Sequence, residues 1–222
     1  MNAIKNAPLN SGLFISFEGL DLSGKSTQIS LLTDRIRKMG SPFILIREPG
    51  GTPISERIRE ILLDLKNHEM TDICELLLYS AARHQLVIQE ISKALEAGKI
   101  VIADRFVDST TAYQGYGRQL PMHFIRQLNL IVTEGLIPDV TFFLDLSYDE
   151  MIDRRKFRAE TADRLESQGK IFYERIRDGY LEIADQNSTR FKIIDATLPI
   201  DHIGEQIWEF VADFLPFKNI KY

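Results

Sequence analysis

Cysteine is almost absent from this sequence of 222 residues, which contains a single one, Cys74. One thiol excludes a disulfide within the chain and cannot by itself make a zinc site. We therefore expect a protein of the reducing cytoplasm. Long apolar runs are missing too: residues 1–8 lack the apolar centre of a signal peptide, and no stretch is apolar for long enough to span a bilayer. We expect neither export nor a membrane partner.

An excess of positive charge is also lacking, because the formal net charge is −5. Without a broad basic surface we expect no nucleic-acid partner, and any phosphate must be recognised by local arginines. This favours a small phosphorylated substrate. The length and the 44% hydrophobic content suit one large domain or two small ones. Because no linker or repeat interrupts the pattern, we expect a flexible tail over 1–12 and one domain over 13–222.

Five short apolar runs alternate with helical patterns, which predicts strands buried on both faces of a parallel sheet. The expected fold is α/β: a three-layer sandwich of the P-loop NTPase type, with a five-stranded parallel sheet flanked by helices. Ligands bind at the carboxyl ends of the strands in such folds. Apolar residues at helical spacing over 74–97 predict one long helix that ends at Gly98. The expected strands are Leu13–Phe17, Phe43–Ile46, Ile100–Ala103, Val140–Leu144 and Phe191–Ile194.

A glycine-rich segment, residues 19–27, follows the first expected strand and fits the pattern G-x-x-x-x-G-K-[ST]. In this pattern backbone N–H groups bind phosphate oxygens, Lys25 bridges the β- and γ-phosphates, and the Ser26 hydroxyl ligates Mg²⁺. A glycine-rich turn before an ordinary helix is the alternative. The flanking strand and the amphipathic segment over 28–39 favour nucleotide binding. We expect ATP to contact Gly19, Leu20, Asp21, Leu22, Ser23, Gly24, Lys25, Ser26 and Thr27.

The base-reading motif of guanine-specific switches is absent, since neither Asn-Lys nor Thr-Lys occurs in the sequence. The pattern D-x-x-G occurs at 21–24 and 201–204, neither at the end of a second strand where a γ-phosphate switch belongs. A motor ATPase would need partner-binding segments for which the chain has little room. A kinase of small molecules remains.

Charged residues follow the other expected strands. Asp104 is positioned to hold the metal or its water, and Arg105 to grip a second phosphate; a helix-capping Asp beside a solvated Arg is the alternative. Residues 47–52, Arg-Glu-Pro-Gly-Gly-Thr, likewise combine an arginine with a loop that lets a ligand approach closely, although a plain turn has the same composition. The basic residues over 154–158 fit a mobile lid, about 154–166, that closes over a triphosphate, or simply a solvated helix face.

Further short motifs occur in the same order as in a known family. They are 17–28, 47–52, Ala-Ala-Arg (81–83), Asp-Arg-Phe (104–106), 109–115, Asp-Arg-Leu-Glu (163–166) and Ile-Asp-Ala-Thr (194–197). As an ordered set these motifs resemble thymidylate kinases, from position 14 to about 195. The resemblance implies transfer of the γ-phosphoryl group of ATP to dTMP, which gives dTDP and ADP for dTTP synthesis. It also implies Mg²⁺ and a homodimer.

The resemblance implies roles for the residues that bind dTMP. Tyr79 would stack on thymine and Arg83 would bond its carbonyl, whereas a core aromatic beside a surface arginine is the alternative. Thr110 would read the base, and Tyr113 would crowd the 2′ position of the sugar. Residues 195–197 would border adenine. The implied dTMP-binding residues are Asp21, Arg47, Pro49, Tyr79, Arg83, Arg105, Thr110, Tyr113 and Gln114.

One branch of the family carries an arginine where this chain has Leu22, so the resemblance implies that the catalytic positive charge comes from the lid. We choose Arg158, with Arg154 and Arg155 as alternatives. The expected catalytic residues are Lys25, Asp104, Arg105 and Arg158, with Ser26 and Asp104 as metal ligands. A different nucleoside or nucleoside monophosphate kinase, or a regulatory P-loop module without catalysis, remains an alternative function.

Overall fold

The computed structural model describes residues 12–157, 164, 165 and 168–215. Five parallel strands form one sheet in the order β2-β3-β1-β4-β5. This confirms the predicted sheet, and each predicted strand is right to within one residue. Every strand continues to a charged residue just past its apolar run, because backbone pairing does not depend on side-chain polarity. The strands are β1 (Phe14–Glu18), β2 (Phe43–Arg47), β3 (Ile100–Asp104), β4 (Val140–Asp145) and β5 (Phe191–Asp195).

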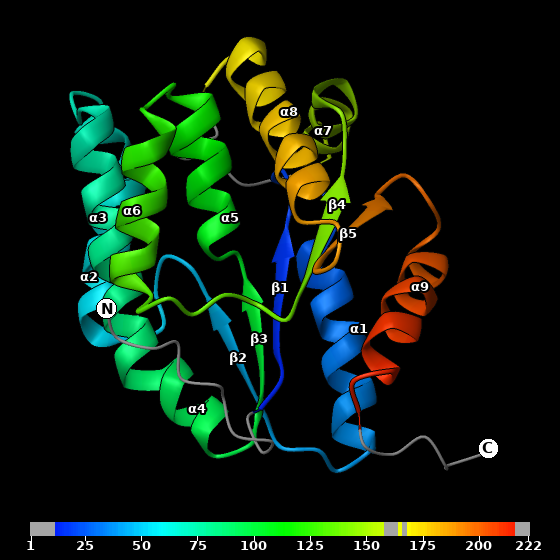
Figure 1. The fold of residues 1–222 in the computed structure, drawn as a ribbon. Helices are drawn as coiled ribbons and strands as arrows, with labels where there is room; N and C mark the ends of the chain where they lie inside the picture. Colours follow the sequence, from blue (N-terminus) through cyan, green and yellow to red (C-terminus); the bar gives the residue numbers. More distant parts are fainter. Residues whose placement is uncertain (1–11, 158–163, 166–167, 216–222) are drawn as a thin grey trace.

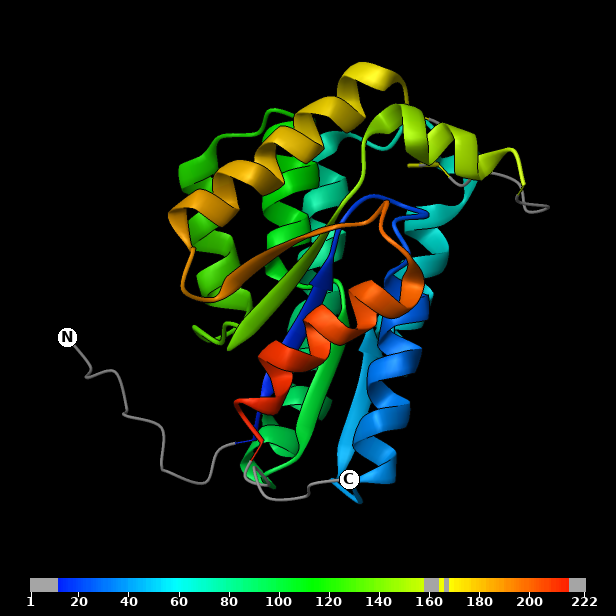
Figure 2. The same cartoon turned by 90° about the vertical axis from the view of Figure 1, so that its right-hand side faces the viewer.

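Helices cover both faces of the sheet, as expected for an α/β sandwich (Figures 1 and 2). α1 and α9 lie together on one face, and α4, α5 and α8 cover the other, while α2, α3 and α6 form a group at one side (Figure 1). The described helices are α1 (Lys25–Lys38), α2 (Pro53–Leu63), α3 (Asp72–Leu86), α4 (Ser92–Glu96), α5 (Val107–Thr110), α6 (Met122–Val132), α7 (Tyr148–Arg155), α8 (Lys170–Gln186) and α9 (Ile200–Ala212).

Two π-helical segments modify this helical layer. The first, η2 (Val87–Ile91), joins α3 to α4, so the long helix predicted over 74–97 is continuous but contains one wide turn. It ends as predicted: Gly98 has a φ of 71°, and the amide of Lys99 donates to the carbonyl of Ala94 at 3.0 Å. The second, η3 (Thr111–Gly117), continues α5. Single-turn π segments are frequent at functional sites.

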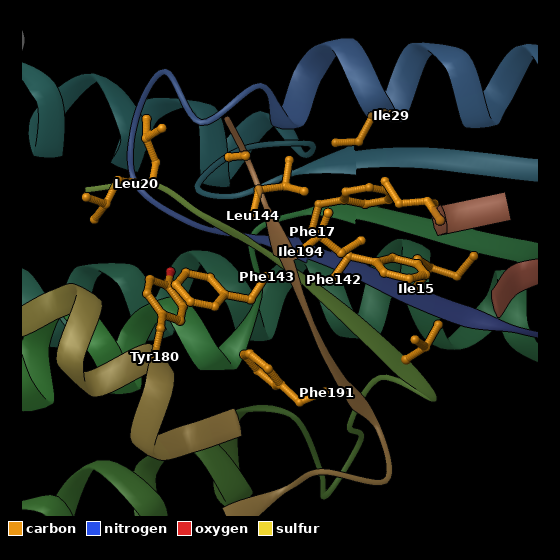
Figure 3. Packing of buried hydrophobic residues seen from close by; sticks show 14 of the residues in the cluster. Ile15, Phe17, Leu20, Ile29, Phe142, Phe143, Leu144, Tyr180, Phe191 and Ile194 are labelled. Atoms are coloured by element: carbon orange, nitrogen blue, oxygen red, sulfur yellow. The ribbon is translucent and has the colours of Figure 1, made fainter. Parts of the chain in front are cut away.

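The core is built from residues that alternate along the strands. Ile15 and Phe17 of β1 pack with Phe142 of β4 and Ile29 of α1, whereas Phe143 faces the other way and stacks on Tyr180 of α8 with ring centroids 4.8 Å apart (Figure 3). Successive side chains of a strand point to opposite faces, so a strand covered on both sides reads as a continuous apolar run. Because all five strands are parallel, their carboxyl ends lie along one edge of the sheet.

Candidate functional site

The P-loop runs from the end of β1 to the start of α1. Gly19 has a φ of 140° and Gly24 a φ of 96°, backbone conformations that favour glycine. A Cβ at Gly19 would lie 2.6 Å from the carbonyl oxygen of Leu144 on the neighbouring strand, so no other residue fits there without a shift. Lys25 Nζ donates to the carbonyls of Gly19 and Leu20, at 3.2 and 2.8 Å. The lysine therefore lies along the loop that the triphosphate would occupy.

Burial shapes the charge of this lysine. Burial, together with the positive charge of Arg105, lowers the pKa of Lys25 to about 8, although the negative charges of Asp104 and Asp21 act in the opposite direction. A cation that is poorly solvated in this way gains strongly from an anionic ligand. A bound phosphate would raise this pKa again and keep the lysine charged.

A cavity of about 500 Å³ opens over the P-loop. It is lined by Leu22, Gly24, Lys25, Ser26 and Thr27, and from the ends of other strands by Arg47, Glu48 and Asp104. A second cavity of about 110 Å³ adjoins it. Four side chains line both cavities and form their junction: Asp21, Glu48, Arg59 and Arg105. Two ligands placed in these cavities would meet at this junction.

The second cavity collects most of the predicted acceptor residues. Tyr79 and Arg83, four apart on α3, both line it, and so do Thr110 of α5 and the two η3 residues Tyr113 and Gln114. Glu48 and Pro49 are contributed by the loop after β2, and Leu63 and Leu165 add apolar surface. An aromatic face, apolar walls and a few fixed polar groups suit a flat heterocycle.

Arg83 is buried, and almost all the hydrogen-bond donors of its guanidinium already have partners. Its Nε donates to Glu48 at 2.7 Å, Nη1 to the Thr110 hydroxyl at 2.6 Å, and Nη2 to the carbonyl of Phe106 at 3.0 Å. Burial raises the pKa of Glu48, and the neighbouring guanidinium of Arg83 counteracts this rise. Nη2 also lies 2.7 Å from Glu48, and Nη1 carries two N–H groups, so Nη1 retains one donor for a ligand.

Arg105 is held from three sides at the junction. Its guanidinium donates to Asp21 at 2.8 Å, to the carbonyl of Gly19 at 2.9 Å and to Ser109 at 3.2 Å. Beneath it lies Glu18, which is buried and accepts from the Phe106 amide at 2.7 Å. Burial, and with it the negative charge of Asp108, raises the pKa of Glu18 to about 7, although Ser109 and Arg105 act to lower it. The cation at the junction is thus held in place, and a fully buried carboxyl group with a pKa near neutrality lies behind it, outside both cavities.

Two arginines differ from the predicted arrangement. Arg47, expected among the dTMP-binding residues, lines the P-loop cavity and is ion-paired with Glu56 at 2.9 Å; it does not line the acceptor cavity. Arg59 of α2, which sequence reasoning missed, lines both cavities and donates to the carbonyl of Pro49 at 3.1 Å. Nothing local distinguishes it from the neighbouring Arg57, so only the fold could identify it.

The basic segment lies partly outside the described residues, and Arg158 is among the positions that are not described. Of the alternatives, Arg154 donates to the carbonyl of Leu22 in the P-loop at 2.9 Å and to that of Ala196 at 2.6 Å. This arginine therefore bridges the P-loop to the loop after β5, which was expected to border adenine. Arg155 ends α7.

The residues present fit Mg²⁺. Ser26 and Asp104 line the same P-loop cavity and offer the hydroxyl and carboxylate oxygens that this ion prefers. Mg²⁺ keeps several waters and binds proteins through one or two carboxylates together with substrate phosphates. Within the described part of the chain no cluster of three or more His, Cys, Asp or Glu could hold a metal by itself. A Mg²⁺ ion bound here would therefore take its remaining ligands from phosphate oxygens and water.

Comparison with known proteins decides between the remaining kinases. The family model described as thymidylate kinase matches residues 17–207. The chain belongs to the thymidylate kinase family. It is 45% identical to the thymidylate kinase of Symbiobacterium thermophilum over 92% of this chain and 94% of that protein. It is also 45% identical to the thymidylate kinase of Chlorobaculum tepidum, over 88% of this chain and 94% of that protein.

A solved structure agrees with this membership of the thymidylate kinase family. The crystal structure of thymidylate kinase from Ehrlichia chaffeensis superposes on this chain with a TM-score of 0.74 at 34% sequence identity. The superposition covers 91% of this chain and 99% of the Ehrlichia chain. The predicted family and fold are confirmed. None of the described helices has the length and apolarity needed to cross a membrane.

Proposed function

We propose that this member of the thymidylate kinase family transfers the γ-phosphoryl group of ATP to dTMP and forms dTDP and ADP. The observation that carries the proposal is the junction at which the P-loop cavity meets a base-sized cavity lined by Tyr79 and Arg83. In this arrangement ATP occupies the P-loop with its γ-phosphate at the junction. The monophosphate of dTMP approaches from the second cavity, with thymine against Tyr79.

The chemical obstacle is repulsion between two anions, since the acceptor phosphate is already ionised at neutral pH. Catalysis therefore consists of positioning and charge compensation. Lys25 and the P-loop amides hold the donor phosphates, and Arg105 and Arg59 hold the acceptor phosphate, with Arg47 beside the donor cavity. Arg158 supplies a further positive charge from the lid. Bound Mg²⁺, held by Ser26 and Asp104, would lower the charge of the phosphates.

The acceptor is selected by the second cavity. Arg83 donates to a carbonyl of the base, Thr110 and Gln114 complete the polar wall, and Pro49 lies near the thymine methyl group. Tyr113, a buried side chain, crowds the 2′ position and disfavours ribose. Asp21 faces the sugar or the metal shell, and residues 195–197 border adenine.

Exposed apolar side chains on α2, α3 and α6 support the homodimer that belongs to this proposal. These three helices lie together at one side of the molecule (Figure 1). Their outer surface exposes Ile54, Ile61, Ile73, Leu77, Leu130 and Ile131. Grouped apolar exposure of this kind marks a protein–protein interface. A cytoplasmic location is the remaining part of the proposal and suits a chain whose sequence contains one cysteine.

The test is an acceptor panel with ATP and magnesium: dTMP, dUMP, dCMP, the ribose form of TMP, and thymidine. We expect dTMP-dependent release of ADP, with dTMP preferred and the ribonucleotide poorly used. A preference for another monophosphate or for thymidine would support the alternative kinase instead. Nucleotide binding without any acceptor-dependent ADP release would support a regulatory P-loop protein.

A further inference from the structure

Glu75 is a buried carboxylate that lies behind the acceptor cavity without lining it. It is on α3, one helical turn before Tyr79. Two arginines surround it: Arg118 contacts both carboxylate oxygens, at 3.2 and 3.0 Å, and Arg164 contacts Oε2 at 2.6 Å. Burial by itself would raise the pKa of Glu75, but the hydrogen bonds and charges of its partners, first Arg118, hold it below its usual value. Glu75 is therefore ionised and can only accept hydrogen bonds.

The third partner of Glu75 is Gln114, whose Nε2 lies 2.9 Å from Glu75 Oε1. A carboxamide has one donating end and one accepting end, and an ionised carboxylate can face only the donating end. The orientation of Gln114 thus follows from chemistry: its NH₂ group faces Glu75. Among the described residues no hydrogen bond reaches the opposite atom, Oε1, and Gln114 lines the acceptor cavity. Gln114 Oε1 is therefore available to accept a hydrogen bond from a ligand in the cavity.

Gln114 lies on the side of the cavity where a base belongs. The transferred group must be at the junction of the two cavities, which is formed by residues that line both. Gln114, Tyr79 and Leu165 line the second cavity only, away from the P-loop. In the proposed reaction the heterocycle is therefore within their reach.

Thymine and uracil carry N–H at N3, whereas cytosine has an unprotonated, accepting N3. An oxygen held against N3 bonds the first two bases and leaves two acceptors facing each other with cytosine. A buried polar group left unpaired in this way lowers affinity strongly. We propose that Glu75 is a positioning residue that locks the Gln114 carboxamide so that the pocket takes a base with N–H at N3 and rejects cytosine. This inference rests on the proposed function and names the source of its base selectivity.

The test compares kcat/KM for dTMP and for dCMP in the full chain and in Glu75→Gln. The carboxamide introduced there can place its own NH₂ toward Gln114, which allows Gln114 to turn and offer NH₂ to the cavity. We expect the preference for dTMP over dCMP to fall by about tenfold or more, with dCMP gaining relative to dTMP. A general loss of packing would lower both values together.

Two further variants separate selectivity from stability. Arg118→Gln removes a cation from Glu75 but leaves the carboxylate, so the melting temperature should fall while the preference stays. In a Gln114→Met background, Glu75→Gln should cause no additional change in the preference, because it acts through Gln114. If Glu75→Gln alone does not fold, the charge-balanced pair Glu75→Gln/Arg118→Gln, compared with Arg118→Gln, provides the same measurement.

Two results would overturn the inference. One is a folded Glu75→Gln variant that keeps the original preference for dTMP over dCMP. The other is a change in that preference that is equally large when Glu75→Gln is made in the Gln114→Met background. Either result leaves the proposed function standing, provided that the unaltered chain phosphorylates dTMP. If the unaltered chain phosphorylates no nucleotide, the proposed function itself fails.

Discussion

Arg105 has a φ of 73°, a left-handed conformation that costs a non-glycine residue about 1–2 kcal/mol. The contacts on either side oppose this cost: the Arg105 amide donates to the carbonyl of Phe17 at 3.0 Å, and the next amide, Phe106, donates to Glu18. Glu18 also accepts from Ser109 and from Tyr180 of α8. One buried carboxyl group therefore connects the start of the P-loop, the backbone beside Arg105 and helix α8.

The raised pKa of Glu18 makes stability depend on pH. The folded protein binds this proton up to about pH 7, whereas the ordinary value is 4.5, so the free energy of unfolding falls as pH rises from about 4.5 to about 7. The loss is on the order of 3 kcal/mol. Glu18→Gln should remove this slope, and urea unfolding of both proteins from pH 5 to pH 8 measures it. Parallel pH curves for the two proteins would contradict the assignment.

Lys25 is the residue whose loss should stop the reaction. We expect Lys25→Ala to lower kcat by about 10³-fold, because a fixed charge that stabilises the transferring group is removed. The fold should survive, since α1 keeps its packing on the core. Kinetics with saturating ATP and circular dichroism melting measure the two effects, and Lys38→Ala at the exposed end of the same helix is the control. A near-normal rate in Lys25→Ala would refute the role.

At the scale of elements, α8 packs against η3 and so supports the segment that carries Tyr113 and Gln114. The contact depends on Gly179, where a Cβ would lie 2.6 Å from ring carbons of Tyr116. Gly179→Ala should therefore lower the free energy of unfolding by about 1–3 kcal/mol despite the better helix propensity of alanine. Chemical denaturation measures this loss.

Gly204 of α9 provides the matched control for Gly179. A Cβ there would meet only the ends of the Gln28 and Leu31 side chains, at 3.3 and 3.6 Å, which can move. Gly204→Ala should leave stability unchanged or raise it slightly. Equal losses in the two variants would show that the packing of α8 on η3 is not the cause.

The predicted lid also has a testable role at this scale. Because Arg154 is bound to two backbone carbonyls, Arg158 remains our choice for the arginine that acts on the transferring phosphate. Arg158→Ala should lower kcat much more than it weakens dTMP binding, and steady-state kinetics with calorimetric dTMP titration separates the two. A large loss in Arg155→Ala together with a silent Arg158→Ala would show that the lid arginine is misplaced.

At the scale of the whole molecule, the apolar surface of α2, α3 and α6 predicts a dimer. Leu77, half exposed at the centre of α3, should be buried between copies, so Leu77→Glu should weaken dimerisation by about 30-fold or more. Sedimentation equilibrium measures the dissociation constant. Ile171→Glu, on α8 and away from this surface, should leave it unchanged. A monomeric unaltered chain would contradict the predicted dimer.

Local patterns predicted most of the fold and part of the site. The strands were predictable because each is a short apolar run, and the P-loop because its nine residues are consecutive. Arg59 was not predictable, since its sequence neighbours look like any solvated helix. The hydrogen bonds of Glu18 and Glu75 were equally invisible: the partner Ser109 is 91 positions from Glu18, and the partner Arg164 is 89 positions from Glu75.

The sequence by itself determined the parallel sheet, the position of the phosphate loop and the family, because each depends on the type and spacing of residues close together in the chain. The tertiary structure alone decided which charged groups are buried, which arginines line the two cavities, and which way Gln114 is oriented. These properties depend on solvation and on partners from distant strands and helices, which become neighbours only when the sheet and its two helical layers have packed.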